Sequence, residues 1–331
     1  MAVSFIAGMA LFKGGASEML TKVKVNWKED AVSHYMTELI DYAGLFPPAA
    51  LPLKDAILNY HSYFQEEDSW MLGAFVIPAS RLGELEPFRD LFNEQLPLRL
   101  SIILSKSDEL STDLDAIQLF TETYQTAGMI EAIEVSPSFQ LSSRIFEKLD
   151  QLISGYRIYS EIAGTNEQLQ SSLNIIKRLN QDSSRPIGIK FRMGGISANL
   201  FPSAKKTAYV IHECKRLGFS LKFTAGLHHP IRQYRKEVET IMHGFVNVFT
   251  ASIMAYCLSI TEETIEAILL EDDPKNFIFT TNELSWRNLT VSSKEINKAR
   301  NVFALSYGSC SFDEPREELG ELVLFQKEAV R

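Results

Sequence analysis

The strongest constraint on the fold is a regular alternation between short β-like runs and longer amphipathic segments. The β-like runs, rich in β-branched and aromatic residues, are 39–49, 71–79, 98–105, 130–137, 156–163, 186–195 and 220–230. The segments of helical length are 53–65, 81–94, 112–127, 140–153, 166–180 and 203–217, with one more near 30–39. A repeat of about thirty residues is typical of βα units in a parallel sheet.

With an eighth, less clear run at 244–252, this rhythm predicts a TIM-type (β/α)8 barrel. The surrounding stretch HGFVNVFTASIMAYCL (243–258) also fits a buried helix, because periodicity does not separate the two for a continuous apolar run. An open doubly wound sheet is the alternative fold. No GxGxxG or GxxxxGK[ST] motif follows an early strand, which disfavours it.

We divide the chain into an N-terminal lead-in (1–29), the barrel (30–272) and a C-terminal α+β extension (273–331) that packs on the barrel. In the extension, NFIFTTNELSW (276–286) predicts a strand and turn, and SSKEINKARNVFALS (292–306) predicts a helix. Ser292 or Ser293 is its expected N-cap, with Glu295 in the first turn. GSCSFDEPREELGEL (308–322) predicts a loop and a short helix.

The charge composition favours some classes of binding partner over others. The net charge of −9 argues against a nucleic-acid binder, since affinity for phosphate backbones comes from clustered Lys and Arg. The stretch 185–236 is nevertheless rich in Lys, Arg and His. A cationic pocket inside an acidic shell suits a small anionic substrate.

The three cysteines, Cys214, Cys257 and Cys310, lie far apart without a CxxC motif, so we expect neither a disulfide framework nor a structural zinc site. This usage fits a reducing, cytoplasmic compartment. The apolar stretch 1–12 lacks the basic start of a signal peptide and is too short to span a bilayer, so no membrane partner is expected. The sequence implies no cofactor. Assembly of the chain into a homo-oligomer is an open alternative.

Two strand-like segments carry a lysine shortly before glycine: GIKFRMGG (188–195) and LKFTAGLHHP (221–230). Alternation places Lys190 with Arg192 on one face of the first strand, and Lys222 with Thr224 on one face of the second. Like charges lower each other's proton affinity, which would free one lysine amine to attack a carbonyl and form a Schiff base. The alternative is a structural network of both lysines with Asp41, Glu134 or Glu161.

Three carboxylates are expected at the same end of the barrel, where barrel enzymes carry their functional groups. Asp41 ends the first strand, although it also fits a turn cap. Glu134 lies nearer the end of its strand than Glu131, on the opposite face, and Glu161 has the corresponding place one strand later. They would form a proton relay with the lysines or balance their charge.

The expected substrate contacts lie on the neighbouring loops and are Arg192, Thr224, Gly226, His228, His229 and Asn247. Arg192 fits an anion clamp, because a guanidinium does not deprotonate in proteins. Adjacent histidines point to opposite sides, so a metal would need distant ligands such as Asp41, Glu161 or His243. An acid–base role and a packing role stay open for both histidines.

These segments resemble the class I aldolase barrels, especially deoxyribose-phosphate aldolase. LIDYAGLFPPA (39–49) resembles that family's opening strand, GIKFRMGG its Schiff-base strand, and LKFTAGL the next strand with its second lysine. The resemblance implies that Lys190 forms the Schiff base, Lys222 tunes it and Asp41 supports it. Phe191, Arg192 and Met193 replace the family's small hydroxylated residues, and the twin histidines have no counterpart. The chain also resembles an uncharacterised bacterial family with KFRxGG, AGLHHP, HGFxN and GSCSFxEP motifs.

The sequence therefore favours an enzyme that acts on a small anionic carbonyl compound, with aldolase-like lyase chemistry through a lysine Schiff base. One alternative is a metal-dependent hydrolase or lyase with His, Asp and Glu ligands. The other is a non-catalytic protein that binds a phosphorylated or carboxylated small molecule.

Overall fold

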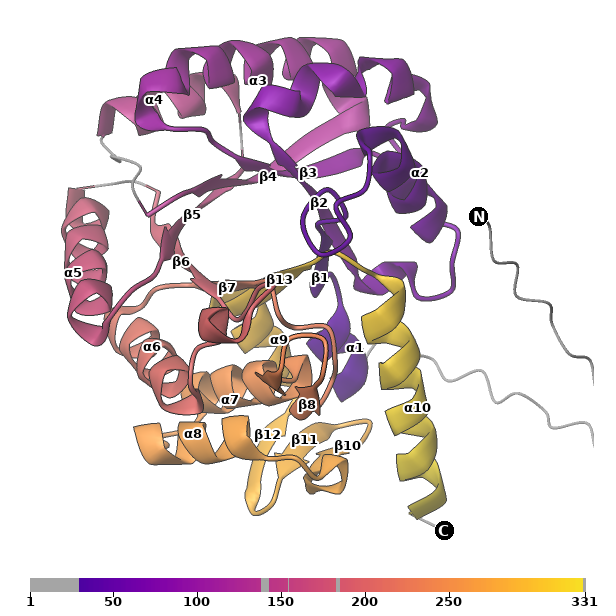
Figure 1. Cartoon of the computed structure of the whole chain (residues 1–331), viewed down its shortest axis with the longest axis vertical. Helices are drawn as coiled ribbons and strands as arrows, with labels where there is room; N and C mark the ends of the chain where they lie inside the picture. Colours follow the sequence, from indigo (N-terminus) through magenta and orange to yellow (C-terminus); the bar gives the residue numbers. More distant parts are fainter. Residues whose placement is uncertain (1–29, 138–142, 154, 183–184, 330–331) are drawn as a thin grey trace, which may run out of the picture.

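The chain forms a closed barrel of parallel strands surrounded by helices (Figure 1). The computed structural model describes residues 30–137, 143–153, 155–182 and 185–329, so the predicted lead-in at 1–29 lies outside the described residues. Around the barrel the strands follow the order β1 (Ile40–Tyr42), β13 (Ala304–Ser309), β7 (Leu221–Thr224), β6 (Ile187–Arg192), β5 (Arg157–Ile162), β4 (Gly128–Val135), β3 (Leu98–Ile103) and β2 (Leu72–Pro78). The predicted (β/α)8 barrel is confirmed.

Helices connect the successive strands on the outside of the barrel. They are α2 (Leu53–Tyr63), η2 (Ala79–Leu91), α3 (Leu110–Tyr124), α4 (Ser143–Leu152), α5 (Asn166–Asp182) and α6 (Ala204–Leu217), and α1 (Ala31–Met36) precedes β1. The ends of α6 follow local rules: the Ser203 side chain caps its first turn, and Gly218 ends it in the left-handed conformation. The predicted helix at 81–94 is instead the 3-10 segment η2, since Pro87 in its interior lacks the N–H that an α-helix needs.

The prediction of an eighth strand at 244–252 is wrong, because these residues begin the helix α7 (Phe245–Cys257). The barrel is closed by β13, which pairs with β7 on one side and β1 on the other. The barrel therefore extends beyond residue 272, into the segment assigned to the extension. The helix predicted over 292–306 ends at Val302, and residues 304–306 belong to β13.

The sequence of helix α7 also fits a buried strand, because the helix is mostly apolar and is buried on all sides over most of its length. Its residues from Phe245 to Ala255 are all buried. Phe249 contacts the ring of Phe223 on β7, and Phe245 stacks on Tyr307 of β13. Within the described residues, no helix combines the length and the apolar character that crossing a membrane requires.

A long insertion separates β7 from β13. It contains the hairpin β8 (Gln233–Arg235) and β9 (Thr240–Met242), the helices α7, α8 (Glu262–Leu270) and α9 (Ser293–Val302), and the antiparallel sheet β10 (Phe277–Phe279), β11 (Glu283–Trp286) and β12 (Leu289–Ser292). The predicted N-cap of α9 is confirmed, since Ser292 and Glu295 form a reciprocal capping box. After β13, α10 (Asp313–Ala329) extends away from the barrel (Figure 1).

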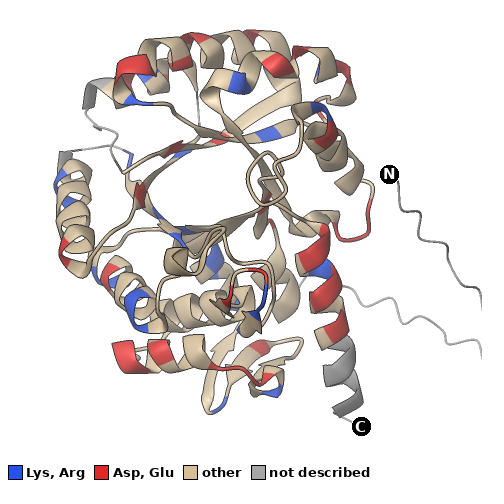
Figure 2. Cartoon of the chain, viewed as in Figure 1, with Lys and Arg blue, Asp and Glu red and all other residues tan. Residues whose placement is uncertain are grey.

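The two faces of the barrel strands differ in chemistry. On β6, Ile187, Ile189 and Phe191 belong to the main apolar core, whereas Lys190 alternates with them and faces the interior. Inside the barrel, Ala132, Tyr159 and Leu305 form a separate small apolar cluster. The interior is therefore partly charged, and Lys and Arg positions occur with Asp and Glu positions on the barrel strands (Figure 2).

A buried cation holds the start of the closing strand. The Arg300 guanidinium donates hydrogen bonds to the carbonyl oxygens of Tyr35 (2.8 Å) and Thr37 (2.9 Å) in the α1 region, and to those of Ala304 and Leu305. Burial lowers the pKa of Arg300 to about 10, so the side chain remains charged at neutral pH. One side chain thus joins α1, α9 and β13.

We expect Arg300→Leu to lower the free energy of unfolding by about 3–5 kcal/mol, because three buried carbonyl oxygens and one partly buried carbonyl oxygen lose a charged donor. Urea denaturation measures the change. Lys294→Leu is the matched control, because Lys294 is exposed on the same helix and should change stability by only about 0.5 kcal/mol. Equal stability of the two variants would contradict the anchoring role of Arg300.

Candidate active site

A cavity of about 450 Å³ opens at the carboxyl ends of the barrel strands, where barrel enzymes have their sites. Its size is in the range of small-molecule sites. The predicted residues that line it are Glu134, Glu161, Lys190, Arg192, Lys222, Thr224, Gly226 and His228. Pro47, Pro48 and Cys310 from the loops after β1 and β13 also line it.

Glycines allow the loops after β6 and β7 to approach each other closely at this rim. A Cβ on Gly194 would lie 2.8 Å from the Gly226 Cα, and one on Gly226 would lie 2.6 Å from the Gly194 Cα. Gly226 also has a φ of +71°, which favours glycine. The glycines that follow the two lysine strands therefore bring the ends of β6 and β7 together.

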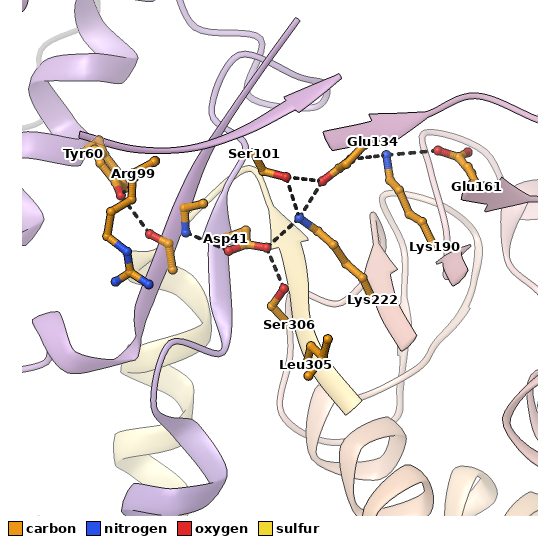
Figure 3. A network of polar contacts seen from close by, with 12 residues as sticks. Asp41, Tyr60, Arg99, Ser101, Glu134, Glu161, Lys190, Lys222, Leu305 and Ser306 are labelled. Atoms are coloured by element: carbon orange, nitrogen blue, oxygen red, sulfur yellow. Dashed lines mark hydrogen bonds and ion pairs between the residues drawn. The ribbon is translucent and has the colours of Figure 1, made fainter. Parts of the chain in front are cut away.

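Lys222 lies in the centre of the barrel and is almost fully buried. Its Nζ lies 2.7 Å from Asp41 Oδ2 and 2.5 Å from Glu134 Oε1, and it donates a hydrogen bond to Ser101 Oγ at 3.0 Å. These partners come from three different strands (Figure 3). All three donor positions of the ammonium are thus occupied.

Glu134 connects the two lysines. Its Oε1 contacts Lys222, while its Oε2 lies 2.6 Å from Lys190 Nζ. Ser101 Oγ donates a further hydrogen bond to Oε1 at 2.6 Å. Lys190 and Lys222 are register partners on adjacent strands, so one carboxylate can reach both ammonium groups (Figure 3).

Lys190 lies at the cavity end of this network. Its Nζ is 3.1 Å from Glu161 Oε2, and the other oxygen of Glu161 pairs with Arg192 at 3.1 Å. The Arg192 side chain is 43% exposed, whereas that of Lys190 is 7% exposed. The order from the centre to the opening is therefore Lys222, Glu134, Lys190, Glu161 and Arg192.

Asp41 completes the network on the side of β1. Its Oδ1 accepts a hydrogen bond from the Ala74 backbone N–H at 2.7 Å, and its Oδ2 accepts one from Ser306 Oγ at 2.7 Å. A Cβ on Gly73 would lie 2.2 Å from Oδ1, so glycine is required there for this carboxylate position. Asp41 thus orients Lys222 and does not line the 450 Å³ cavity.

The charges within the network change two proton affinities. Burial alone would raise the pKa of Glu134, but Lys190 and Lys222 outweigh it and hold that pKa well below its ordinary value. Burial likewise opposes the charge on Lys222, yet Asp41 and Glu134 raise the Lys222 pKa well above its ordinary value. The expectation that a neighbouring lysine lowers the pKa of the other therefore does not hold for Lys222, because the Glu134 carboxylate lies between the two ammonium groups.

Two of the predicted substrate contacts, Asn247 and His229, lie outside the cavity. Asn247 is fully buried: its Oδ1 accepts from the Arg232 N–H, and its Nδ2 donates to the carbonyl oxygens of Ile268 and Glu271. His229 pairs with Glu318 on α10. Neither residue lines the cavity, so the structure does not bring them to the predicted substrate site.

The metal ligands considered from the sequence do not converge. Asp41 pairs with Lys222, Glu161 pairs with Lys190 and Arg192, and the two histidines contact α10. His243 donates a hydrogen bond from its Nε2–H to the Pro202 carbonyl oxygen at 2.8 Å. A metal site within the described residues must therefore use a different set of ligands.

Three contributors to the site were not predicted. Ser101 and Ser306 are small polar residues at inward positions of β3 and β13, and alternation in LRLSIILS (98–105) could have identified Ser101. Ser306 could not be found while β13 was assigned to a helix. The third feature is not a residue but a second cavity of about 190 Å³. It lies beside Asp41 and Lys222 and is also lined by Arg99, Glu131 and Arg300.

No protein-family model matches the chain, and no curated protein matches it significantly.

We expect Glu134→Gln to lower the free energy of unfolding at pH 7 by about 3–5 kcal/mol, because two buried lysines lose their shared anion. The folded-state pKa of Glu134 lies below the ordinary value of 4.5. Its contribution is therefore present above pH 4.5 and is lost as the pH falls through the folded-state pKa. The difference between wild type and variant should shrink steadily below pH 4.5 in urea denaturation.

Glu94→Gln is the control for this pH series, because Glu94 is exposed. A wild-type to Glu134→Gln difference that stayed constant from pH 7 to pH 3 would show that Glu134 does not stabilise the fold as a buried carboxylate.

Proposed function

We propose that this barrel is an enzyme that forms or breaks a carbon–carbon bond in a small anionic carbonyl compound, through an imine at Lys190. The observation that carries the proposal is the placement of Lys190. Its amine lies on the wall of a 450 Å³ cavity, 2.6 Å from the Glu134 carboxylate and 3.1 Å from that of Glu161, which would take its proton. The barrel fold is compatible with enzyme function in general, and the lysine chemistry is our inference.

The two lysines would have different roles. Lys222 is held charged by Asp41 and Glu134, which makes it a poor nucleophile and a permanent cation beside the reaction centre. That cation competes with Lys190 for the Glu134 carboxylate. Lys190, which lies at the cavity end of the network, is the better candidate for the nucleophile.

Imine formation begins when Lys190 gives a proton to Glu161 and its lone pair attacks the carbonyl carbon of the substrate. The carbonyl oxygen takes back that proton and a second one from the Lys190 nitrogen, and it leaves as water, so that a protonated imine links Lys190 to the substrate. The imine then accepts the electron pair of the carbon–carbon bond one atom away from the imine carbon, while the hydroxyl group on the leaving carbon gives its proton to Glu161 and that fragment departs as an aldehyde. The enamine left on Lys190 takes up this proton, water releases it as the second product, and the reverse sequence forms the carbon–carbon bond.

The anionic group of the substrate would lie near the opening. Arg192 is the most exposed cation of the network, and its pairing with Glu161, its carboxylate partner among the described residues, leaves part of the guanidinium toward solvent. Thr224 and His228 line the same cavity and offer further hydrogen-bonding groups. The resemblance of the β1, β6 and β7 segments to class I aldolases supports the same assignment.

Borohydride trapping tests the imine. With acetaldehyde, pyruvate and glyoxylate as probes, at least one should give a reduced adduct on the peptide that contains Lys190, identified by mass spectrometry. Lys190→Met should abolish the adduct and lower turnover of the responding compound at least about 1,000-fold, because the covalent path is lost. Lys177→Met, at an exposed lysine, is the control.

An adduct on Lys222, or none with any small aldehyde or 2-keto acid, would contradict the proposal. Thermal stabilisation by a carboxylate or phosphate compound without an adduct or turnover would instead favour the non-catalytic binding protein.

Lys222→Met separates the two lysine roles. Without Lys222, Glu134 pairs with Lys190 alone, so the ion pair that Lys190 must leave in order to react is stronger, and the trapping rate at pH 7 should fall at least about tenfold while the adduct stays on Lys190. Far-UV circular dichroism checks that the variant is folded. An unchanged trapping rate would show that Lys222 does not tune Lys190.

A further inference from the structure

The loop after β7 meets α10 in a cluster of potential metal ligands outside the lysine network. His229 Nδ1 lies 2.8 and 2.9 Å from the two carboxylate oxygens of Glu318. Glu314 lies one helical turn earlier, with its Oε1 3.9 Å from His229 Nε2. One donor atom from each of the three residues lies within 4.8 Å of the others.

The burial of the three side chains differs in a way that suits an ion site. The His229 side chain is only 2% exposed, so its ring has a defined position, and its backbone oxygen accepts from the Phe245 N–H at 2.9 Å. Glu314 and Glu318 are 39% and 34% exposed, which leaves their oxygens open to an ion from solvent. The cluster therefore combines a fixed donor with two accessible ones.

The charge of the cluster favours a cation. Glu314 also contacts the neighbouring histidine, with its Oε2 3.2 Å from His228 Nδ1. The two carboxylates of Glu314 and Glu318 therefore bring two acidic groups to one face of the His229 ring. Acidic positions recur along the described part of α10 (Figure 2).

We propose that His229, Glu314 and Glu318 form a site for a divalent first-row metal ion such as Zn²⁺ or Mn²⁺. One imidazole nitrogen and two carboxylates are ligands that these ions accept, and three protein ligands leave room for water or another ligand. Binding requires the imidazole without a proton on the ligating nitrogen, so the ion replaces a proton between the ring and the carboxylates. This site does not depend on the proposed imine chemistry.

An ion bound at this site would link α10 to the loop after β7, at the rim of the cavity. His229 follows His228, which lines the cavity and contacts Glu314 at 3.2 Å. The ligands come from both sides of this contact, one from the β7 loop and two from α10. An ion bound to all three should therefore hold the β7 loop and α10 together.

The test uses the full chain, dialysed against EDTA and then freed of the chelator. Titration calorimetry with Zn²⁺ and with Mn²⁺ should show one site per chain for at least one ion, and Co²⁺ should give visible absorption bands with the same stoichiometry. The variant Glu314→Gln/Glu318→Gln should weaken binding at least about 100-fold and remove the Co²⁺ bands. Glu317→Gln, at an exposed position of the same helix, should bind like wild type.

Either of two results would overturn the proposal. One is the absence of stoichiometric binding of all three ions to the wild-type protein. The other is unchanged affinity in the double variant, which would place the ion elsewhere on the chain. Both glutamates are partly exposed, so their replacement should leave the fold intact, and a thermal unfolding curve of the EDTA-treated variant checks this.

Discussion

The position of the Glu134 carboxylate between two lysines is the interaction on which the interior of this barrel depends. Two ammonium groups on adjacent strands would repel each other strongly in a buried setting. Glu134 contacts both, and Asp41 and Glu161 each contact one of them from the outer sides. With Arg192, the network contains three cations and three carboxylates, so a charged barrel interior is compatible with a stable fold.

The same arrangement makes the two lysines unequal. The Lys222 ammonium has three protein partners, Asp41, Glu134 and Ser101, whereas the Lys190 ammonium contacts two carboxylates at the cavity end of the network. The distinction comes from neighbouring strands, because each lysine occupies an equivalent register position on its own strand. A candidate nucleophile and a permanent cation thus arise from one residue type through their surroundings.

Much of this arrangement could be predicted from the chain. Strand alternation correctly placed Glu134, Lys190 and Lys222 inside one barrel, and the βα rhythm identified the strands up to β7. The closing strand was missed because a short strand directly after a helix has no periodicity of its own, while the apolar helix α7 imitates a strand. Asn247 was misplaced for the same reason, since its site role assumed that 244–252 is a strand. Pairing of the histidines with α10 depends on tertiary contacts that no local pattern encodes.

The separation of β13 from the other strands has a consequence for biosynthesis. The insertion between β7 and β13 spans 225–303, so an emerging chain has seven barrel strands and an open edge on β1 and β7 for a long interval. Unpaired strand edges are sites of aggregation, and contacts between distant residues form slowly. The barrel cannot close before residues 304–309 have left the ribosome, so the nascent protein should need protection by chaperones at this stage more than a barrel with evenly spaced strands would.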